Sequence, residues 1–171
     1  MNWPLVTVGM TGFLALTFTV CALASWLRRD MGGELFAFAA LVAVFTILSR
    51  VVSAYSDMPW SAILWPLQDM VCAAVATAMW NNRPDRWKAA IASCFAIQCG
   101  AHVLYWWWVL NDGARWEATV AYLWIINPFF VVELSVLTLA GGRLVADYVV
   151  SRRVVSLDNA PVHVVGHGGR R

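Results

Sequence analysis

The sequence predicts an all-α membrane protein, a bundle of five transmembrane helices with the N-terminus outside and the C-terminus in the cytoplasm. Hydrophobic residues make up 61% of the chain and charged residues only 13%, with a mean hydropathy of +0.65. This is too little charge for a water-soluble domain of 171 residues. The apolar residues also lie in long blocks of about 20, the length that crosses the hydrocarbon core of a bilayer.

Five such blocks follow one another, separated by residues that end or begin helices. Gly32 and Gly33 follow the first block, Pro59 precedes the third, Pro84 precedes the fourth and Gly113 precedes the fifth. The connections are short, so consecutive helices are expected to run antiparallel, and no block alternates with the period of two that a transmembrane barrel requires. The predicted spans are residues 5–27, 35–52, 60–80, 87–110 and 117–140, which form one transmembrane domain of residues 1–142.

The distribution of basic residues predicts the orientation, because Lys and Arg are retained on the cytoplasmic side during insertion. Of the twelve, only Arg50 and Arg115 lie at predicted outer ends. The other ten are Arg28, Arg29, Arg83, Arg86, Lys88, Arg143, Arg152, Arg153, Arg170 and Arg171. An odd number of spans with an outer N-terminus places the ten basic residues in the cytoplasm and the other two outside. We therefore expect a multi-pass protein of a bacterial-type inner (plasma) membrane.

The first block has one feature of a cleaved signal peptide, the small residues Ala22 and Ala24 before Ser25. Residues 1–4 contain no Lys or Arg, and cleavage would force the two arginines that follow to cross the membrane. We therefore expect the first helix to stay attached.

Residues 143–171 are predicted to form a cytoplasmic basic tail. Its first part mixes apolar and charged residues, and is expected either to continue the fifth helix or to lie on anionic lipid. From Asp158 onward the chain has Pro and Gly residues and little to bury, so this distal part is expected to be disordered.

The eleven Trp residues lie mostly near the predicted span ends. An indole favours the headgroup level, where its ring is apolar and its N–H remains hydrated. Consecutive helical residues face about 100° apart, so the run at positions 106–108 cannot form one stacking wall. The predicted outer anchors are Trp60, Trp65, Trp106, Trp107, Trp108 and Trp116.

Polar residues inside the spans are the candidate functional residues, because each costs free energy to insert into lipid. Asp69 and His102 lie at similar depth, about 12 to 13 Å from the outer ends of their helices. Asn127 precedes Pro128, whose ring frees a backbone carbonyl near the midplane. We predict a polar cluster in the outer half of the bundle, formed by Arg50, Asp69, Gln98, His102 and Asn127. It would relay protons, coordinate a cation, or serve only as a structural network that makes insertion tolerable.

Small residues repeat at four-residue spacing on the fourth span, which allows close helix approach within one chain or between copies. Glu133 lies deep in the fifth span, about 240° around the helix from Asn127, and is expected to face a different neighbour. The candidate packing or oligomer face comprises Ala92, Ala96, Gly100 and Glu133.

No cofactor, metal site or enzymatic activity is predicted. The four cysteines lack a CxxC spacing, and His102 is the only histidine within a span, too few for a haem held by paired histidines. Asp69 is the only deeply placed aspartate, whereas an intramembrane aspartyl protease needs two. Lys88, the only lysine, lies at a helix end rather than where a retinal Schiff base would form. A net charge of +2, divided among the loops, also argues against nucleic acid as a partner.

Two function classes follow from these features. The first is a small transport or channel-type subunit that uses the polar cluster. The second is a membrane-assembly or lysis protein acting through helix association, since the size, orientation and basic tail are similar to those of phage holins. The expected partners are the lipid bilayer and either further copies of the chain or a larger membrane complex. Size, helix count and Trp content are also similar to those of tryptophan-rich sensory proteins, but Trp65-Pro66 lies inside a span without further prolines, so no family is assigned.

Overall fold

A computed structural model describes residues 3–55, 61–113 and 116–158, and these ranges form helices joined by short turns. The prediction of an all-helical chain is confirmed. The helices are α1 (Trp3–Leu27), α2 (Arg29–Tyr55), α3 (Ser61–Asn82), α4 (Arg86–Asp112) and α5 (Trp116–Asp158). Residues 143–158 continue α5 as helix, and the predicted disorder after Asp158 falls outside the described residues.

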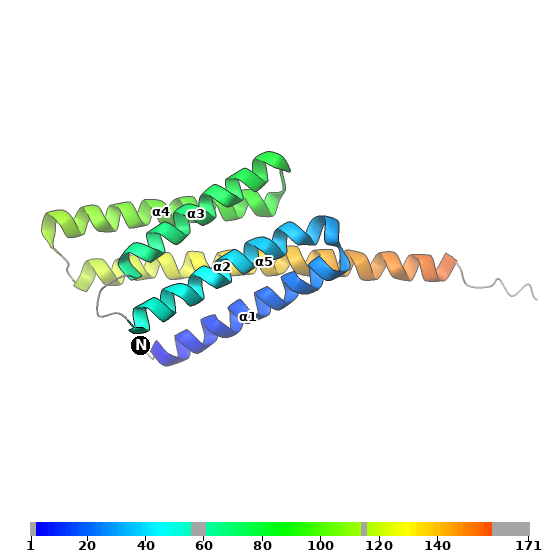
Figure 1. Ribbon diagram of the computed structural model, residues 1–171, viewed down its shortest axis with the longest axis horizontal. Helices are drawn as coiled ribbons and strands as arrows, with labels where there is room; N and C mark the ends of the chain where they lie inside the picture. Colours follow the sequence, from blue (N-terminus) through cyan, green and yellow to red (C-terminus); the bar gives the residue numbers. More distant parts are fainter. Residues whose placement is uncertain (1–2, 56–60, 114–115, 159–171) are drawn as a thin grey trace, which may run out of the picture.

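Figure 1 shows two antiparallel hairpins, α1–α2 and α3–α4, with α5 between them. Helix α5 packs against α1, α2 and α4, while α2 also packs against α3. With 43 residues, α5 is about 65 Å long, roughly twice the hydrocarbon thickness of a bilayer. It therefore projects beyond the end of the bundle where the two hairpin turns lie (Figure 1).

The described basic residues divide between the two ends of the bundle. Arg50 lies toward the end of α2 that faces away from the hairpin turns. The others lie at the hairpin-turn end or on the projecting part of α5: Arg28, Arg29, Arg83, Arg86, Lys88, Arg143, Arg152 and Arg153. We call this end of the bundle the basic end, and the opposite end the distal end.

The turn between α1 and α2 is tighter than the sequence predicts. The break expected at Gly32 and Gly33 lies instead at one residue, Arg28, and both glycines belong to the first turns of α2. A Cβ atom on Gly32 would lie 2.5 Å from the carbonyl oxygen of Ala24, whereas one on Gly33 would meet nothing within 4 Å. The missing side chain at Gly32 thus allows α2 to start directly against the end of α1.

Four helical segments are long and apolar enough to cross a membrane, namely Val8–Leu27, Arg29–Val52, Arg86–Asp112 and Thr119–Arg153. Helix α3, whose described side chains include Gln68 and Asp69, is not among them. Those two side chains are buried, whereas Leu67 and Met70 are exposed. At residues 67–70, helix α3 thus turns its polar residues inward and its apolar residues outward.

The same inside-out arrangement extends around the whole bundle. Every helix exposes large apolar side chains, for example Leu16, Val44, Met70, Val103 and Leu139. The buried polar or charged residues are Thr17, Ser49, Gln68, Asp69, Lys88, Gln98, His102 and Glu133. Apolar surface on this scale is unstable in water and suits a lipid solvent, so the chain is embedded in a membrane.

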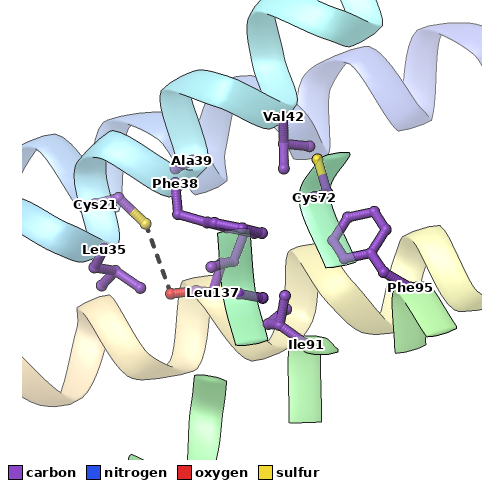
Figure 2. Close-up of a cluster of buried hydrophobic side chains, with 10 residues drawn as sticks. Cys21, Leu35, Phe38, Ala39, Val42, Cys72, Ile91, Phe95 and Leu137 are labelled. Atoms are coloured by element: carbon purple, nitrogen blue, oxygen red, sulfur yellow. Dashed lines mark hydrogen bonds between the residues drawn. The ribbon is translucent and has the colours of Figure 1, made fainter. Parts of the chain in front are cut away.

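An apolar core fills the half of the bundle nearer the basic end (Figure 2). All five helices contribute to it, and it consists of Cys21, Leu35, Phe38, Ala39, Val42, Cys72, Ala76, Ile91, Phe95 and Leu137. The Cys21 thiol donates a hydrogen bond to the Leu137 carbonyl oxygen over 3.7 Å, joining α1 to α5. Most of the polar interior lies in the other half.

Candidate functional site

His102 of α4 is the centre of a polar cluster in the distal half of the bundle, with only 3% of its surface exposed. Its Nε2 lies 2.8 Å from Oδ2 of Asp69 on α3, and its Nδ1 lies 2.6 Å from the hydroxyl of Tyr122 on α5. Two proton arrangements fit this geometry. A neutral imidazole donates to Asp69 and accepts from Tyr122, whereas an imidazolium donates to both.

A second polar layer lies between His102 and the distal end. Tyr105 stacks on Tyr122 with ring centroids 4.4 Å apart, and its hydroxyl lies 3.3 Å from Oγ1 of Thr119. Because α4 and α5 are antiparallel, the pair of residues 105 and 119 lies one step further out than the pair of residues 102 and 122. Side-chain hydroxyls thus extend the cluster toward the distal surface.

A cavity of about 130 Å³ lies beside Asp69, and all five helices contribute to its walls. Its polar lining consists of Thr46, Arg50, Gln68, Asp69, Gln98 and Asn127. Four of the five residues of the predicted cluster therefore line one cavity, and the fifth, His102, is hydrogen-bonded to the cavity residue Asp69. Since a water molecule takes up about 30 Å³ of liquid, the cavity has room for a few.

The other cluster residues have different partners. Arg50 is exposed and donates from Nη1 to Oγ1 of Thr11 on α1 over 2.9 Å, while Asp69 pairs with His102. Gln98 is 1% exposed, and its Nε2 lies 3.5 Å from the carbonyl oxygen of Ile126. Within the described structure its Oε1 has no hydrogen-bond partner, so a buried acceptor remains available at the cavity wall.

Two cluster residues, Tyr122 and Gln68, are not among those that the sequence pattern picks out. Gln68 accepts a hydrogen bond from the Ser49 hydroxyl over 3.4 Å and lines the cavity. A tyrosine inside an apolar span needs a partner for its hydroxyl, and this requirement is the signal that points to Tyr122. For Gln68 the signal is its place beside Asp69 in an otherwise apolar stretch.

Glu133 lies apart from the cavity, toward the apolar core. In the pairing of α4 with α5, Gln98 lies opposite Ile126, so Glu133 lies level with Ile91, about 10 Å further along the axis. It is 1% exposed, and neither carboxylate oxygen has a hydrogen-bond partner among the described residues. Glu133 is therefore an interior residue of a single chain.

The small residues predicted to share a face with Glu133 lie elsewhere. Ala96 and Gly100 are exposed on the outside of α4, and Ala92 is half-buried. A Cβ atom added to Gly100 would meet nothing within 4 Å. Ala96 and Gly100 therefore lie on the outer surface of α4, separate from the buried carboxyl group, whereas Ala92 packs against the apolar core.

The predicted Trp anchors are not all alike. Trp107 and Trp108 of α4 are exposed near its distal end, and Trp106 is half-buried. Trp65 is 37% exposed and lines the cavity. Trp60 and the side chain of Trp116 lie outside the described part of the chain.

Lys88 forms a second buried cluster at the basic end, and nothing in its sequence position indicates this. Its side chain is 1% exposed, and Nζ lies 2.5 Å from Glu34 and 3.6 Å from Asp85. Nζ also donates to the carbonyl oxygens of Met79 and Arg83 over 3.3 and 3.0 Å. One ammonium group thus links the start of α2, the end of α3 and the start of α4.

Comparison with known proteins gives no assignment: no family model matches the chain, and no curated protein or solved structure is similar to it. The function is therefore inferred from the geometry of the His102 cluster and its cavity.

Proposed function

We propose that this chain is a small transport or channel-type membrane protein in which Asp69, His102 and Tyr122 conduct protons. The observation that carries the proposal is that both nitrogens of a buried imidazole are hydrogen-bonded, one to a carboxylate beside the cavity. An imidazole accepts a proton on one nitrogen and releases one from the other. Chains of this kind inside membranes characterise proton pathways.

The cavity supports the same function. The Asp69 carboxylate is hydrogen-bonded through Oδ2 to His102. The cavity beside Asp69 adds room for water and an unpartnered amide oxygen on Gln98. Water there would connect Asp69 to the polar groups around it by hydrogen bonds.

We also propose that all five helices cross a bacterial-type inner membrane, with the N-terminus outside. The support is that the described basic residues gather at the basic end, which the charge rule assigns to the cytoplasm. Single cysteines at Asn111 and Ser151 test this with a membrane-impermeant thiol reagent in intact cells. We expect labelling at position 111, and at 151 only after permeabilisation. The reverse pattern would show the opposite orientation.

Proton flux into proteoliposomes tests the function directly. Purified protein is reconstituted into liposomes that contain a pH-sensitive dye. Valinomycin and K⁺ remove the diffusion potential. A pH step is then applied outside, and the change in dye signal reports the proton flux. We expect flux in the wild type and a loss of about tenfold or more in Asp69→Asn and Tyr122→Phe, as for removal of an acid–base group. Tyr148→Phe is the matched control, because that residue lies on the projecting part of α5.

Tyr122→Phe is the decisive variant, because it removes one hydroxyl and keeps the ring that stacks on Tyr105. Wild-type protein that carries no protons, or a folded Tyr122→Phe variant with wild-type flux, would refute the proposal. Poor folding of Asp69→Asn alone would assign the carboxylate a structural role and leave the test to Tyr122→Phe.

The second candidate is a membrane-assembly or lysis function, and the observation that favours it is the exposure of Ala96 and Gly100 on α4. Exposed small residues at four-residue spacing let another helix approach closely. Abrupt loss of viability with membrane permeabilisation on induced expression, prevented by Gly100→Ile, would support this function. Harmless accumulation with pH-dependent flux would support the transport function instead.

A further inference from the structure

A groove of about 1120 Å³ lies at the basic end of the bundle, separate from the His102 cavity. Its walls come from the start of α2, the turn between α3 and α4, the start of α4, and α5. Its volume is slightly larger than the usual range for small-molecule sites, about 300 to 1,000 Å³. The groove therefore suits an occupant larger than a single ion or phosphate group.

Helix α5 contributes one continuous face to this groove, through residues spaced three and four apart from Val136 to Asp147. This face is about 16 Å long, and its chemistry changes along the axis. It is apolar at Val136 and Leu139, deeper in the bundle, and charged at Arg143 and Asp147. Leu139 is 73% exposed, so the described chain leaves the apolar part uncovered.

Most of the acidic residues that line the groove already have basic partners. Nζ of Lys88 lies 2.5 Å from Glu34 and 3.6 Å from Asp85, and Arg28 lies 4.0 Å from Asp30. None of these partners is one of the arginines of the groove. The carboxylates therefore leave those arginines free to meet another anion.

Three arginines line the groove from different elements: Arg83 in the α3–α4 turn, Arg86 at the start of α4, and Arg143 on α5. None of them has an ion-pair partner in the part of the chain that the structure describes. Asp147 is the one carboxylate of the groove that has no ion-pair partner among the described residues. With Lys88 and Arg28, which pair with lining carboxylates, five basic and four acidic side chains give the groove a net charge of +1.

We infer that this groove binds an anionic phospholipid, with its phosphate at Arg83, Arg86 and Arg143 and its acyl chains along the apolar face of α5. Guanidinium groups hold phosphate oxygens in paired hydrogen bonds. Basic pockets between membrane helices on the cytoplasmic side recognise anionic headgroups. The apolar stretch at Val136 and Leu139 distinguishes a lipid from a soluble phosphate, because only the lipid covers it.

Native mass spectrometry of the full chain in detergent tests the inference, with phosphatidylglycerol as probe and phosphatidylcholine of the same acyl chains as control. We expect phosphatidylglycerol to bind preferentially, and Arg143→Gln to weaken its binding about fivefold, the effect of one basic residue near a lipid surface. Arg152→Gln is the matched control, since that arginine lies on α5 beyond the groove. Leu139→Gln should also weaken binding, because the acyl chains lose apolar contact.

Thermal unfolding of the wild type gives a readout that needs no variant. Phosphatidylglycerol should raise the melting temperature more than phosphatidylcholine does, because a ligand of the folded state stabilises it. Equal binding of the two lipids, or equal losses in Arg143→Gln and Arg152→Gln, would overturn the inference. Full displacement of phosphatidylglycerol by sn-glycerol 3-phosphate would assign the site to a soluble phosphate. If the protein formed a dimer, and Arg143→Gln but not Arg152→Gln disrupted it, the site would instead belong to a second copy of the chain.

Discussion

Replacement of Lys88 by Met tests how strongly one buried ammonium group holds three helices together. After the change, the Met79 carbonyl still accepts a hydrogen bond from the Arg83 N–H at 3.1 Å. Glu34 and Asp85 are 40% and 49% exposed, so water can replace the lost contact to each. The loss therefore falls mainly on the Arg83 carbonyl, with a share reduced by hydration from the 2.5 Å contact to Glu34.

A hydrogen bond that involves a charged group contributes about 1.5 to 3 kcal/mol, and solvent exposure of Glu34 brings its share down to about 1 kcal/mol. Met has a similar volume to Lys and keeps the apolar packing. We therefore expect Lys88→Met to lower the free energy of unfolding by about 2 kcal/mol. The assay is equilibrium unfolding in mixed micelles, followed by circular dichroism.

Arg86→Met is the control, because Arg86 is exposed, and its effect should stay within about 0.5 kcal/mol. A double-mutant cycle with Glu34→Gln should give a coupling energy of about 1 kcal/mol. Equal stabilities of the Lys88 and Arg86 variants, or a coupling energy near zero, would show that the Lys88 ammonium group does not hold these helices together.

Three further predictions use the same assay. Gly32→Ala should destabilise the protein by about 1 to 3 kcal/mol, because the added Cβ meets the backbone of α1. Gly33→Ala is the control and should be neutral or stabilising, because its Cβ meets nothing. Equal effects of the two changes would contradict the close contact at Gly32. Glu133→Met should stabilise the fold by about 1 to 3 kcal/mol, since it removes two buried oxygens that have no hydrogen-bond partner among the described residues. Destabilisation would show that the Glu133 carboxyl group has a hydrogen-bond partner. Thr17→Val, which removes the 2.8 Å contact to Thr138, should cost about 0.5 to 1.5 kcal/mol, more than Thr19→Val, whose hydroxyl bonds only within α1.

The elements of this fold follow from sequence because length and hydropathy decide them. Lipid requires each span to be a helix, and prolines, glycines and polar residues mark where spans end. The exact start of α2 cannot be predicted from the sequence, because a glycine such as Gly32 either ends a helix or allows two helices to pack closely. Only the position of Ala24 opposite Gly32 distinguishes the two cases.

Part of the candidate site can be predicted from the sequence, because the depth of a residue along a helix can be counted from the end of the helix. Asp69 and His102 have matched depths, and the structure joins them at 2.8 Å. Rotation of each helix about its axis depends on packing against all its neighbours, so the sequence shows that the Tyr122 hydroxyl needs a partner but not that the partner is His102. The same holds for Glu133, which packing turns inward, away from the exposed surface of α4.

The central place of α5 has a consequence for the order in which the bundle assembles. The two hairpins are synthesised first, yet His102 gains Tyr122, and Thr17 gains Thr138, only when the last helix arrives between them. Until then these groups lack partners that they have in the finished protein. The two hairpins without α5 would keep the bond of Thr17 to the Phe13 carbonyl and that of His102 to Asp69, but each group would have fewer partners in lipid. The arrival of α5 is therefore the step that completes the hydrogen bonds of both groups.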